Sequence, residues 1–228
     1  FNTYHKAHAR LAQVMVNQTV DAETYTGGTV AMPLEDALRT RYSAEFERLS
    51  LASWNNDHIL AFADKKLYGA GMWVQDEFPE MFSLEMLKGS KDALKDPSSI
   101  LLSSSLAKAI FGDEDPVNKM VRLDSKLDMK VAGVFADLPH NTTFYGTKLL
   151  LPWENKENWL NAQTERDNHC GQLFGQLHDE ADFDKINARI KNVPTQFIKE
   201  FKEEILLHPM DKVHLYSEFK NGKAVGGR

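Results

Sequence analysis

The eight histidines of this chain make metal binding the first chemistry to consider. His5 and His8 are three residues apart, so in a helix their imidazoles would share one face and could bind one zinc ion. No carboxylate or cysteine lies at a matching offset beside them. His208 and His214 flank an expected strand and turn, where a structural hydrogen bond is the simpler interpretation. The sequence therefore predicts no metal site.

Nucleophilic catalysis is the second chemistry to consider. Ser103–Ser105 lack the Gly-x-Ser-x-Gly elbow that presents a catalytic serine, and capping of a following helix accounts for them. Cys170, the single cysteine, directly follows His169, and adjacent residues rarely converge into a catalytic pair. The acidic run Asp113–Asp115 lacks the ligand spacing of a calcium loop, and Gly27-Gly28 lacks the lysine of a phosphate loop. We therefore predict that the chain is not an enzyme and holds no cofactor.

Aromatic side chains are the remaining candidates for function. We expect most of them to pack in a core, and a minority to line a hydrophobic surface for a peptide, a lipid or a partner protein. The six that surround the expected junction of two subdomains are Trp54, Trp73, Phe78, Phe82, Trp153 and Trp159.

The stretch from Asp96 to Pro139 predicts a complete structural unit that carries almost no reactive groups. Residues 100–102 form an apolar run typical of a buried strand, and Ser103 can cap the helix that follows. Gly112 stands where a helix C-terminus favours positive φ, and Pro116 prevents the helix from continuing. Residues 120–123 and 129–135 then alternate like the two strands of a hairpin.

Helical and strand patterns also occur outside this unit. Helices are predicted at 3–13, 34–49, 154–163 and from the Asp182 cap onward, with helical character at 76–82 and 197–201. Strands are predicted at 13–20, 51–54, 58–63, 66–73, 148–152, 173–177 and 205–210.

Composition limits the class of protein. The 228 residues are 42% hydrophobic and 26% charged, as in an ordinary soluble globular protein. The net charge of −6 disfavours nucleic acid and anionic membrane surfaces as partners. One cysteine allows no internal disulfide, which fits the cytoplasm or a bacterial periplasm. No run approaches the roughly 20 apolar residues of a membrane span, and without an initial Met or a signal peptide we expect an excised segment.

The order of elements suggests two similar strand–helix–strand halves, 13–63 and 148–209, on either side of the central unit. We therefore predict an α+β fold of two subdomains. A discontinuous βαβ-type subdomain is expected to comprise residues 1–65 and 147–228. A mostly-β subdomain, residues 66–146, is expected to be inserted into it.

Two motifs of the central unit resemble a known family. They are Ser-Leu-Ala-Lys-x-x-Phe-Gly-Asp-Glu-Asp-Pro-x-x-Lys, which begins at Ser105, and Val-x-Gly-Val-Phe-x-Asp-Leu-Pro, which begins at Val131. Both resemble the periplasmic core domain of MacB/FtsX-type ABC transporter permeases. Residues 1–10, 81–89 and 207–217 resemble further segments of that family. Asn118 stands where the family usually has glycine, and both residues suit a tight turn.

The resemblance implies a domain between the first and second transmembrane helices of an inner-membrane permease, with porter and sabre subdomains. Residues 222–228 would then be a linker near the point where the chain re-enters the membrane. It implies a periplasmic location and a homodimeric permease paired with a separate cytoplasmic ATPase that uses the ATP. Movement would pass into this domain by mechanotransmission, for efflux of antibiotics or for export of peptides or lipoproteins. A periplasmic adaptor or an outer-membrane channel could be a further partner. We expect the isolated domain to be monomeric.

Two alternative functions remain open at this stage. The first is a regulatory or sensing permease domain that binds a peptide or activates a cell-wall hydrolase. The second is a free-standing periplasmic binding protein or enzyme, which would need a signal peptide and a convergent polar cluster.

Overall fold

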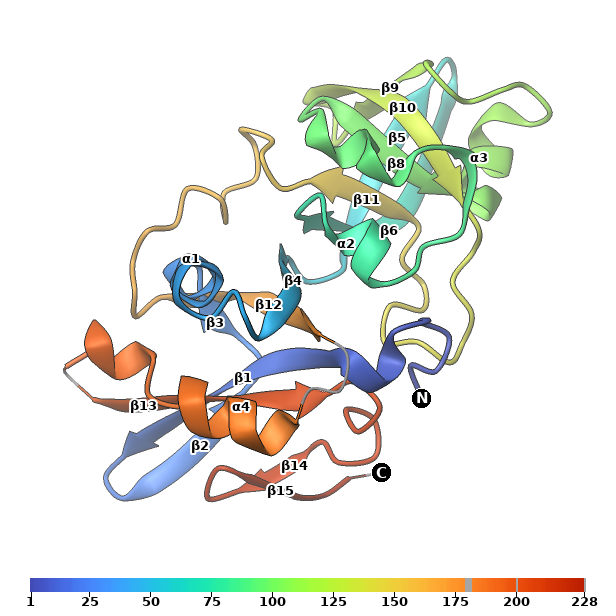
Figure 1. Cartoon of the computed structure of the whole chain (residues 1–228). Helices are drawn as coiled ribbons and strands as arrows, with labels where there is room; N and C mark the ends of the chain where they lie inside the picture. Colours follow the sequence, from blue (N-terminus) through green and yellow to red (C-terminus); the bar gives the residue numbers. More distant parts are fainter. Residues whose placement is uncertain (179–181, 200, 228) are drawn as a thin grey trace. The chain divides into compact units, whose positions relative to one another are not determined.

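The computed structural model describes residues 1–178, 182–199 and 201–227 (Figure 1). The chain forms two compact units. The first comprises Phe1–Leu51 and Ala162–Arg228, and the second comprises Ala52–Asn161. Strands outnumber helices in both units, which confirms the predicted α+β class. Among the described residues, no helix is long and apolar enough to cross a membrane.

The second unit is built around a closed ring of six strands. These are β5 (Asn56–Phe62), β6 (Lys65–Val74), β8 (Ser99–Ser103), β9 (Met120–Leu123), β10 (Leu127–Phe135) and β11 (Leu149–Pro152). The ring runs β5-β6-β11-β8-β10-β9 and closes where β9 pairs with β5. The β6–β11 and β8–β10 pairs are parallel, and the other four are antiparallel. Closure leaves these strands with no free edge.

Helix α3 (Ser104–Phe111) supplies much of the apolar interior of this barrel. The interior consists of Leu60, Ile100, Leu102, Leu106, Ala107, Ile110, Phe111, Val121, Leu123, Met129, Val131, Val134, Leu149 and Leu151. A second helix, α2 (Phe78–Met81), strand β7 (Met86–Gly89) and the 3-10 turn η2 (Lys91–Lys95) complete the unit. Strand β7 pairs with the end of β10.

The first unit is organised around strand β1 (Leu11–Val20). On one side it pairs along nearly its whole length with β13 (Lys202–Pro209), and on the other side it pairs first with β12 (His169–Leu177) and then with β2 (Glu23–Gly27). Strand β3 (Val30–Ala31) pairs with β12, and β4 (Phe46–Ala52) leads into the second unit. All of these β1 pairs are antiparallel.

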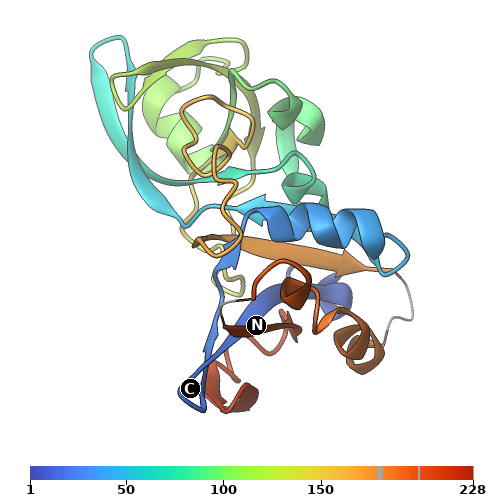
Figure 2. The same ribbon diagram turned by 90° about the vertical axis from the view of Figure 1, so that its left-hand side faces the viewer.

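The remaining elements of the first unit are two helices, two 3-10 turns and a terminal hairpin. Helix α1 (Pro33–Arg41) lies alongside β12 in both views (Figures 1 and 2). Helix α4 (Phe183–Ile190) lies against β13. The 3-10 turns are η1 (His8–Arg10) and η3 (Pro194–Gln196), and the hairpin consists of β14 (Glu218–Lys220) and β15 (Lys223–Gly226).

The central unit of the sequence has the predicted local structure. The Ser103 hydroxyl accepts from the Leu106 N–H at 3.4 Å, and Gly112 ends the helix at φ +65°. The β9–β10 hairpin follows. The Asp182 cap of α4 is also confirmed, because its carboxylate accepts from the N–H groups of Asp184 and Lys185.

The predicted domain boundaries, after residues 65 and 146, differ from those of the structure. Strand β5 lies before the first of them, yet it pairs with β6 and β9 of the barrel. Strand β11 lies after the second, yet it pairs with β6 and β8. The inserted unit therefore begins earlier and ends later than the sequence suggested.

Five local predictions were wrong or incomplete. Residues 3–13 contain only a 3-10 turn before β1, and the helix predicted over 34–49 ends at Arg41, before the buried strand β4. The helix predicted over 154–163 is a series of turns, because the side chains of Asn155 and Asn158 accept from the N–H groups two residues onward. In the segment predicted to be helical over 197–201, Phe197 has non-helical backbone angles, and residue 200 lies outside the described residues. Residues 223–226 form a strand rather than a linker.

Candidate functional site

The first and last segments of the first unit are fastened to each other. The Phe1 ring stacks on His214, with their centroids 4.4 Å apart. The fully buried Asn2 donates its side-chain N–H to the carbonyl of Met210 at 2.8 Å. The His8 imidazole lies 3.2 Å from the Asp211 carboxylate. We call residues 1–8 and 210–214 the terminal clasp.

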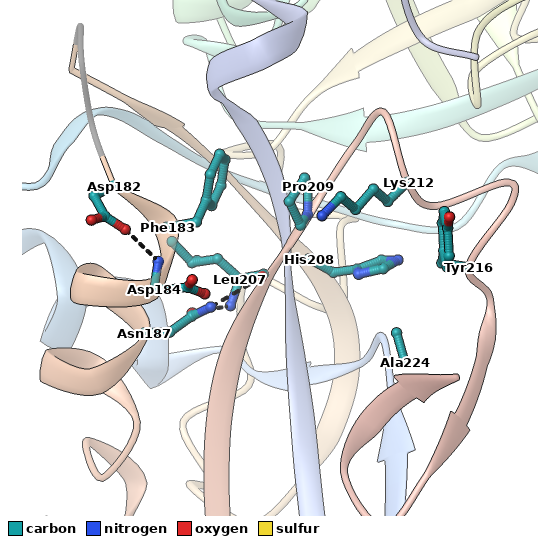
Figure 3. Close-up of a pocket in the computed structure, with 10 residues that line it drawn as sticks. All are labelled: Asp182, Phe183, Asp184, Asn187, Leu207, His208, Pro209, Lys212, Tyr216 and Ala224. Carbon is teal, nitrogen blue, oxygen red and sulfur yellow. Dashed lines mark hydrogen bonds between the residues drawn. The ribbon is translucent and has the colours of Figure 1, made fainter. Parts of the chain in front are cut away.

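An open pocket of about 540 Å³ lies beside this clasp in the first unit (Figure 3). It is lined by α4, the end of β13, the turn after it and β15, with Asp184, His208, Lys212 and Tyr216 as its main polar side chains. Burial of the imidazole, and secondly the charge of Lys212, lowers the pKa of His208. The ring is therefore neutral at pH 7.

The same region shows how the edge of β13 is protected. Among the described strands, β13 pairs only with β1, so its other edge could recruit a foreign strand. The Asn187 side chain of α4 accepts from the Leu207 N–H at 2.6 Å, and the Lys191 carbonyl accepts from the Ile205 N–H at 2.9 Å. Pro209 is the next residue of β13 whose backbone faces this edge, and proline has no N–H group. This edge is therefore a poor site for strand addition.

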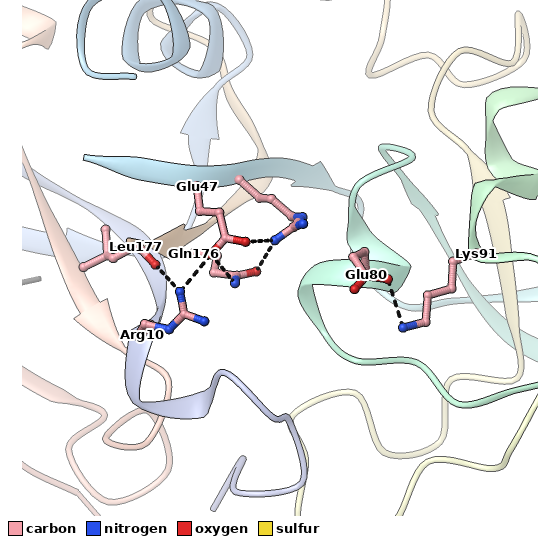
Figure 4. Close-up of polar contacts among 7 residues, drawn as sticks. Arg10, Glu47, Glu80, Lys91, Gln176 and Leu177 are labelled. Carbon is pink, nitrogen blue, oxygen red and sulfur yellow. Dashed lines mark hydrogen bonds and ion pairs between the residues drawn. The ribbon is translucent and has the colours of Figure 1, made fainter. Parts of the chain in front are cut away.

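A polar network joins β4 and β12 to Arg10, the residue just before β1 (Figure 4). Arg10 donates to the Glu47 carboxylate at 2.8 Å and to the Leu177 carbonyl at 2.9 Å, and Gln176 donates to Glu47 at 2.8 Å. Arg48 pairs with the same carboxylate. Burial opposes ionisation of Glu47, but the bonds from Arg10 and Arg48 outweigh it and lower its pKa. Within the second unit, Figure 4 also draws the Glu80–Lys91 ion pair of 3.0 Å.

The serines at the start of α3 belong to a structural network. The Asp137 carboxylate accepts from the hydroxyl groups of Ser104 and Ser105, each at 2.6 Å, from the Ser105 N–H at 2.9 Å, and from the Lys148 ammonium at 2.7 Å. Burial opposes ionisation, but these donors outweigh it and hold the pKa of Asp137 well below its usual range. Both serine hydroxyls therefore donate to Asp137, and the Lys148 side chain donates to the Ser105 hydroxyl at 3.0 Å, as in a structural cap.

The candidate metal and thiol residues are dispersed. Among the described residues, no three His, Cys, Asp or Glu side chains lie together as a metal site would require. His5 is fully buried, whereas His8 pairs with Asp211. Burial raises the pKa of Cys170, which disfavours the reactive thiolate. Its neighbour His169 instead pairs with the buried Glu203 at 2.9 Å.

The six aromatic candidates divide into two groups. Phe78, Phe82 and Trp153 are at most 3% exposed, so the surface prediction was wrong for these three. The rings of Phe78 and Phe82 pack on each other and on Phe144, with centroids 4.5–5.0 Å apart. Trp54 and Trp159 are 49% and 60% exposed, and Trp73 is half-buried. Sequence spacing alone could not separate the two groups.

Comparison with known proteins gives one family and several related structures. A family model, the MacB-like periplasmic core domain, matches residues 1–193. A domain of a putative permease from Porphyromonas gingivalis is similar, with a TM-score of 0.75 and 22% identity over 90% of this chain and 91% of that one.

Two further solved structures share the fold at lower identity. The periplasmic region of MacB from Actinobacillus actinomycetemcomitans has a TM-score of 0.63 and 16% identity, over 90% of this chain and 91% of that one. The extracellular domain of the noncanonic ABC-type transporter YknZ from Gram-positive bacteria has a TM-score of 0.60 and 12% identity, over 87% of this chain and 99% of that one. No curated protein matches the chain significantly.

Proposed function

Since the chain belongs to the family of MacB-like periplasmic core domains of ABC transporter permeases, we propose that it transmits movement from a cytoplasmic ATPase to the periplasmic side. The domain is extracytoplasmic, as the related permease regions are. In this proposal its role is mechanical, and ATP is bound and hydrolysed by the separate ATPase subunit. The transmitted movement drives efflux or the export of a peptide or lipoprotein.

The terminal clasp is the observation that carries this proposal. In the proposed permease, residues 1–8 follow the first transmembrane helix and residues 210–214 approach the second. The buried Asn2–Met210 hydrogen bond and the Phe1–His214 stack join these two segments directly. A displacement of either membrane helix would therefore act on both segments together and move the first unit as one body.

The polar residues of the domain support a mechanical role. Ser104, Ser105 and Lys148 surround Asp137 and fasten α3 to the ends of two strands. The barrel is closed, and α3 packs into one end of it, so it resists deformation. In the assembled permease, we propose a second copy of this chain and the ATPase as obligatory partners, and an adaptor or outer-membrane channel as a periplasmic one.

Breaking the clasp is expected to uncouple this domain from ATP. Asn2→Ala in the full-length permease, assembled with its ATPase, removes the buried donor to Met210. In the wild-type complex we expect a non-hydrolysable ATP analogue to change hydrogen-exchange protection of residues 208–216. In the variant we expect that change to disappear, while the ATPase rate stays within about twofold because no catalytic group is touched.

Asn161→Ala is the matched control, because the same amide is deleted at an exposed position of the second unit. The control should keep the wild-type response. A nucleotide-dependent response in Asn2→Ala equal to that of the wild type would refute the role of the clasp.

A further inference from the structure

A second, smaller pocket lies at one end of the barrel of the second unit. Its volume is about 150 Å³, and its lining includes His58 near the start of β5 and Trp73 near the end of β6. At the other end of these strands, α3 fills the barrel, where the Phe111 ring packs on Phe62 with centroids 4.6 Å apart. The pocket therefore occupies the barrel end that α3 does not fill, and barrel mouths are common ligand sites.

His58 lines this pocket in a fixed orientation. Its Nδ1 lies 2.7 Å from the Asp124 carboxylate, whose other oxygen accepts from the Ile59 N–H at 2.8 Å. Because the carboxylate only accepts, Nδ1 carries the proton of this bond, and in that tautomer Nε2 is an acceptor. Nε2 is buried and has no hydrogen-bond partner among the described residues. Leaving a buried acceptor unpaired costs free energy, so a donor that reaches it is favoured.

The other lining residues indicate the chemistry of that donor. Asp124 and Glu157 contribute two carboxylates against one ammonium, that of Lys126. Within the described part of the chain, neither Glu157 nor Lys126 forms an ion pair. The remaining walls are the Trp73 indole and two leucines. A positive, donor-rich group on an apolar stem matches this lining, because cations are attracted to carboxylates and to indole faces.

Two exposed tryptophans lie next to the lining residues in the chain. Trp54 follows Ser53, whose N–H donates to the Trp73 carbonyl at 2.8 Å. Trp159 follows two residues after Glu157. Trp54 is 49% exposed and Trp159 is 60% exposed. Their indoles therefore provide apolar contact area for the residues that flank the bound group. These are two of the aromatic residues that sequence analysis named as a partner surface.

We propose that the barrel mouth between His58, Trp73 and Glu157 binds the guanidinium side chain of an arginine in a peptide. The guanidinium donates to Glu157 and His58 and packs on Trp73, and the stem lies against Leu123 and Leu127. This inference goes beyond the transmission role proposed above. It is tested on this chain alone, so its failure would leave that role unaffected.

The test is an NMR titration of the chain with three small probes. N-acetyl-arginine amide is expected to bind in the millimolar range and to shift the signals of Trp73 and His58. Its neutral isostere, N-acetyl-citrulline amide, should bind at least about tenfold more weakly, since a charge-assisted hydrogen bond is worth about 1.5–3 kcal/mol. The peptide Ac-Leu-Arg-Leu-NH₂ should bind more tightly than the single amide, through contact with Trp54 and Trp159.

Charge variants of opposite sign make the outcome specific. Glu157→Gln should weaken arginine binding by about fivefold to tenfold, and Lys126→Gln should strengthen it, since one removes attraction and the other repulsion. Both positions are exposed, so folding is preserved. Glu114→Gln removes the same charge beyond the end of α3 and should leave binding unchanged. Equal binding of arginine and citrulline, or no binding of either, would overturn the proposal.

Discussion

Phe82→Ala is expected to lower the free energy of unfolding of the second unit by about 3–5 kcal/mol, the usual cost of truncating a buried phenylalanine. Its ring is 1% exposed and contacts the rings of Phe78 and Phe144, with centroids 4.5 and 4.6 Å away. Truncation removes both contacts and leaves a cavity that the closed barrel unit cannot easily fill. Urea unfolding followed by tryptophan fluorescence measures the change.

Trp159→Ala is the control for this prediction. It deletes an even larger aromatic side chain, but one that is 60% exposed. Its cost should stay below about 1 kcal/mol, because surface substitutions rarely exceed that value. Equal destabilisation by the two variants would show that the division of the aromatic residues into core and surface is mistaken.

Asp137→Asn is expected to be the second large perturbation, with a loss of about 2 kcal/mol at pH 7. Hydrogen bonds to a charged group are worth about 1.5–3 kcal/mol, and the side chain is 36% exposed, so solvent screening limits the effect. The carboxylate gathers four donors from Ser104, Ser105 and Lys148. An amide keeps the shape of the side chain but loses the charge.

The lowered pKa of Asp137 determines how the stability difference between wild type and Asp137→Asn changes with pH. Folding lowers the pKa of Asp137 from its ordinary 3.8, so its ionised form stabilises the folded chain above that pH. The stabilisation is lost as the pH falls from 3.8 towards the lower folded value. The stability difference between wild type and Asp137→Asn should therefore be largest at neutral pH and shrink at pH 3. A difference that is independent of pH would contradict the charge-based explanation.

Local sequence signals predicted the parts of the fold that depend on neighbouring residues. The Ser103 cap, the Gly112 terminus and the Asp182 cap each involve bonds over two to four residues, or a single φ angle, and all three are confirmed. The family motif that begins at Val131 also includes Asp137. The motif could not show that Asp137 bonds to Ser104 and Ser105, because that contact joins residues that are far apart in the sequence.

Nonlocal pairing explains where prediction from the sequence failed. The sheet contacts of β5 and β11 place them in the barrel, and no local pattern reports which strands pair. The segment at 154–163 has helical spacing, yet Asn155 and Asn158 bond to nearby backbone and form turns instead. No sequence pattern pointed to His58, because its contact with Asp124 and the pocket beside it form only in the folded barrel.

In the proposed function, ATP binding on one side of the membrane moves this domain on the other. The most direct measurement places a nitroxide on the exposed position 68 of both permease copies, as Tyr68→Cys with Cys170→Ser, in the assembled full-length transporter. Double electron–electron resonance then gives the distance between the two copies of the second unit. We expect a distance distribution that shifts between the nucleotide-free and ATP-bound states. The same distribution in both states would contradict it.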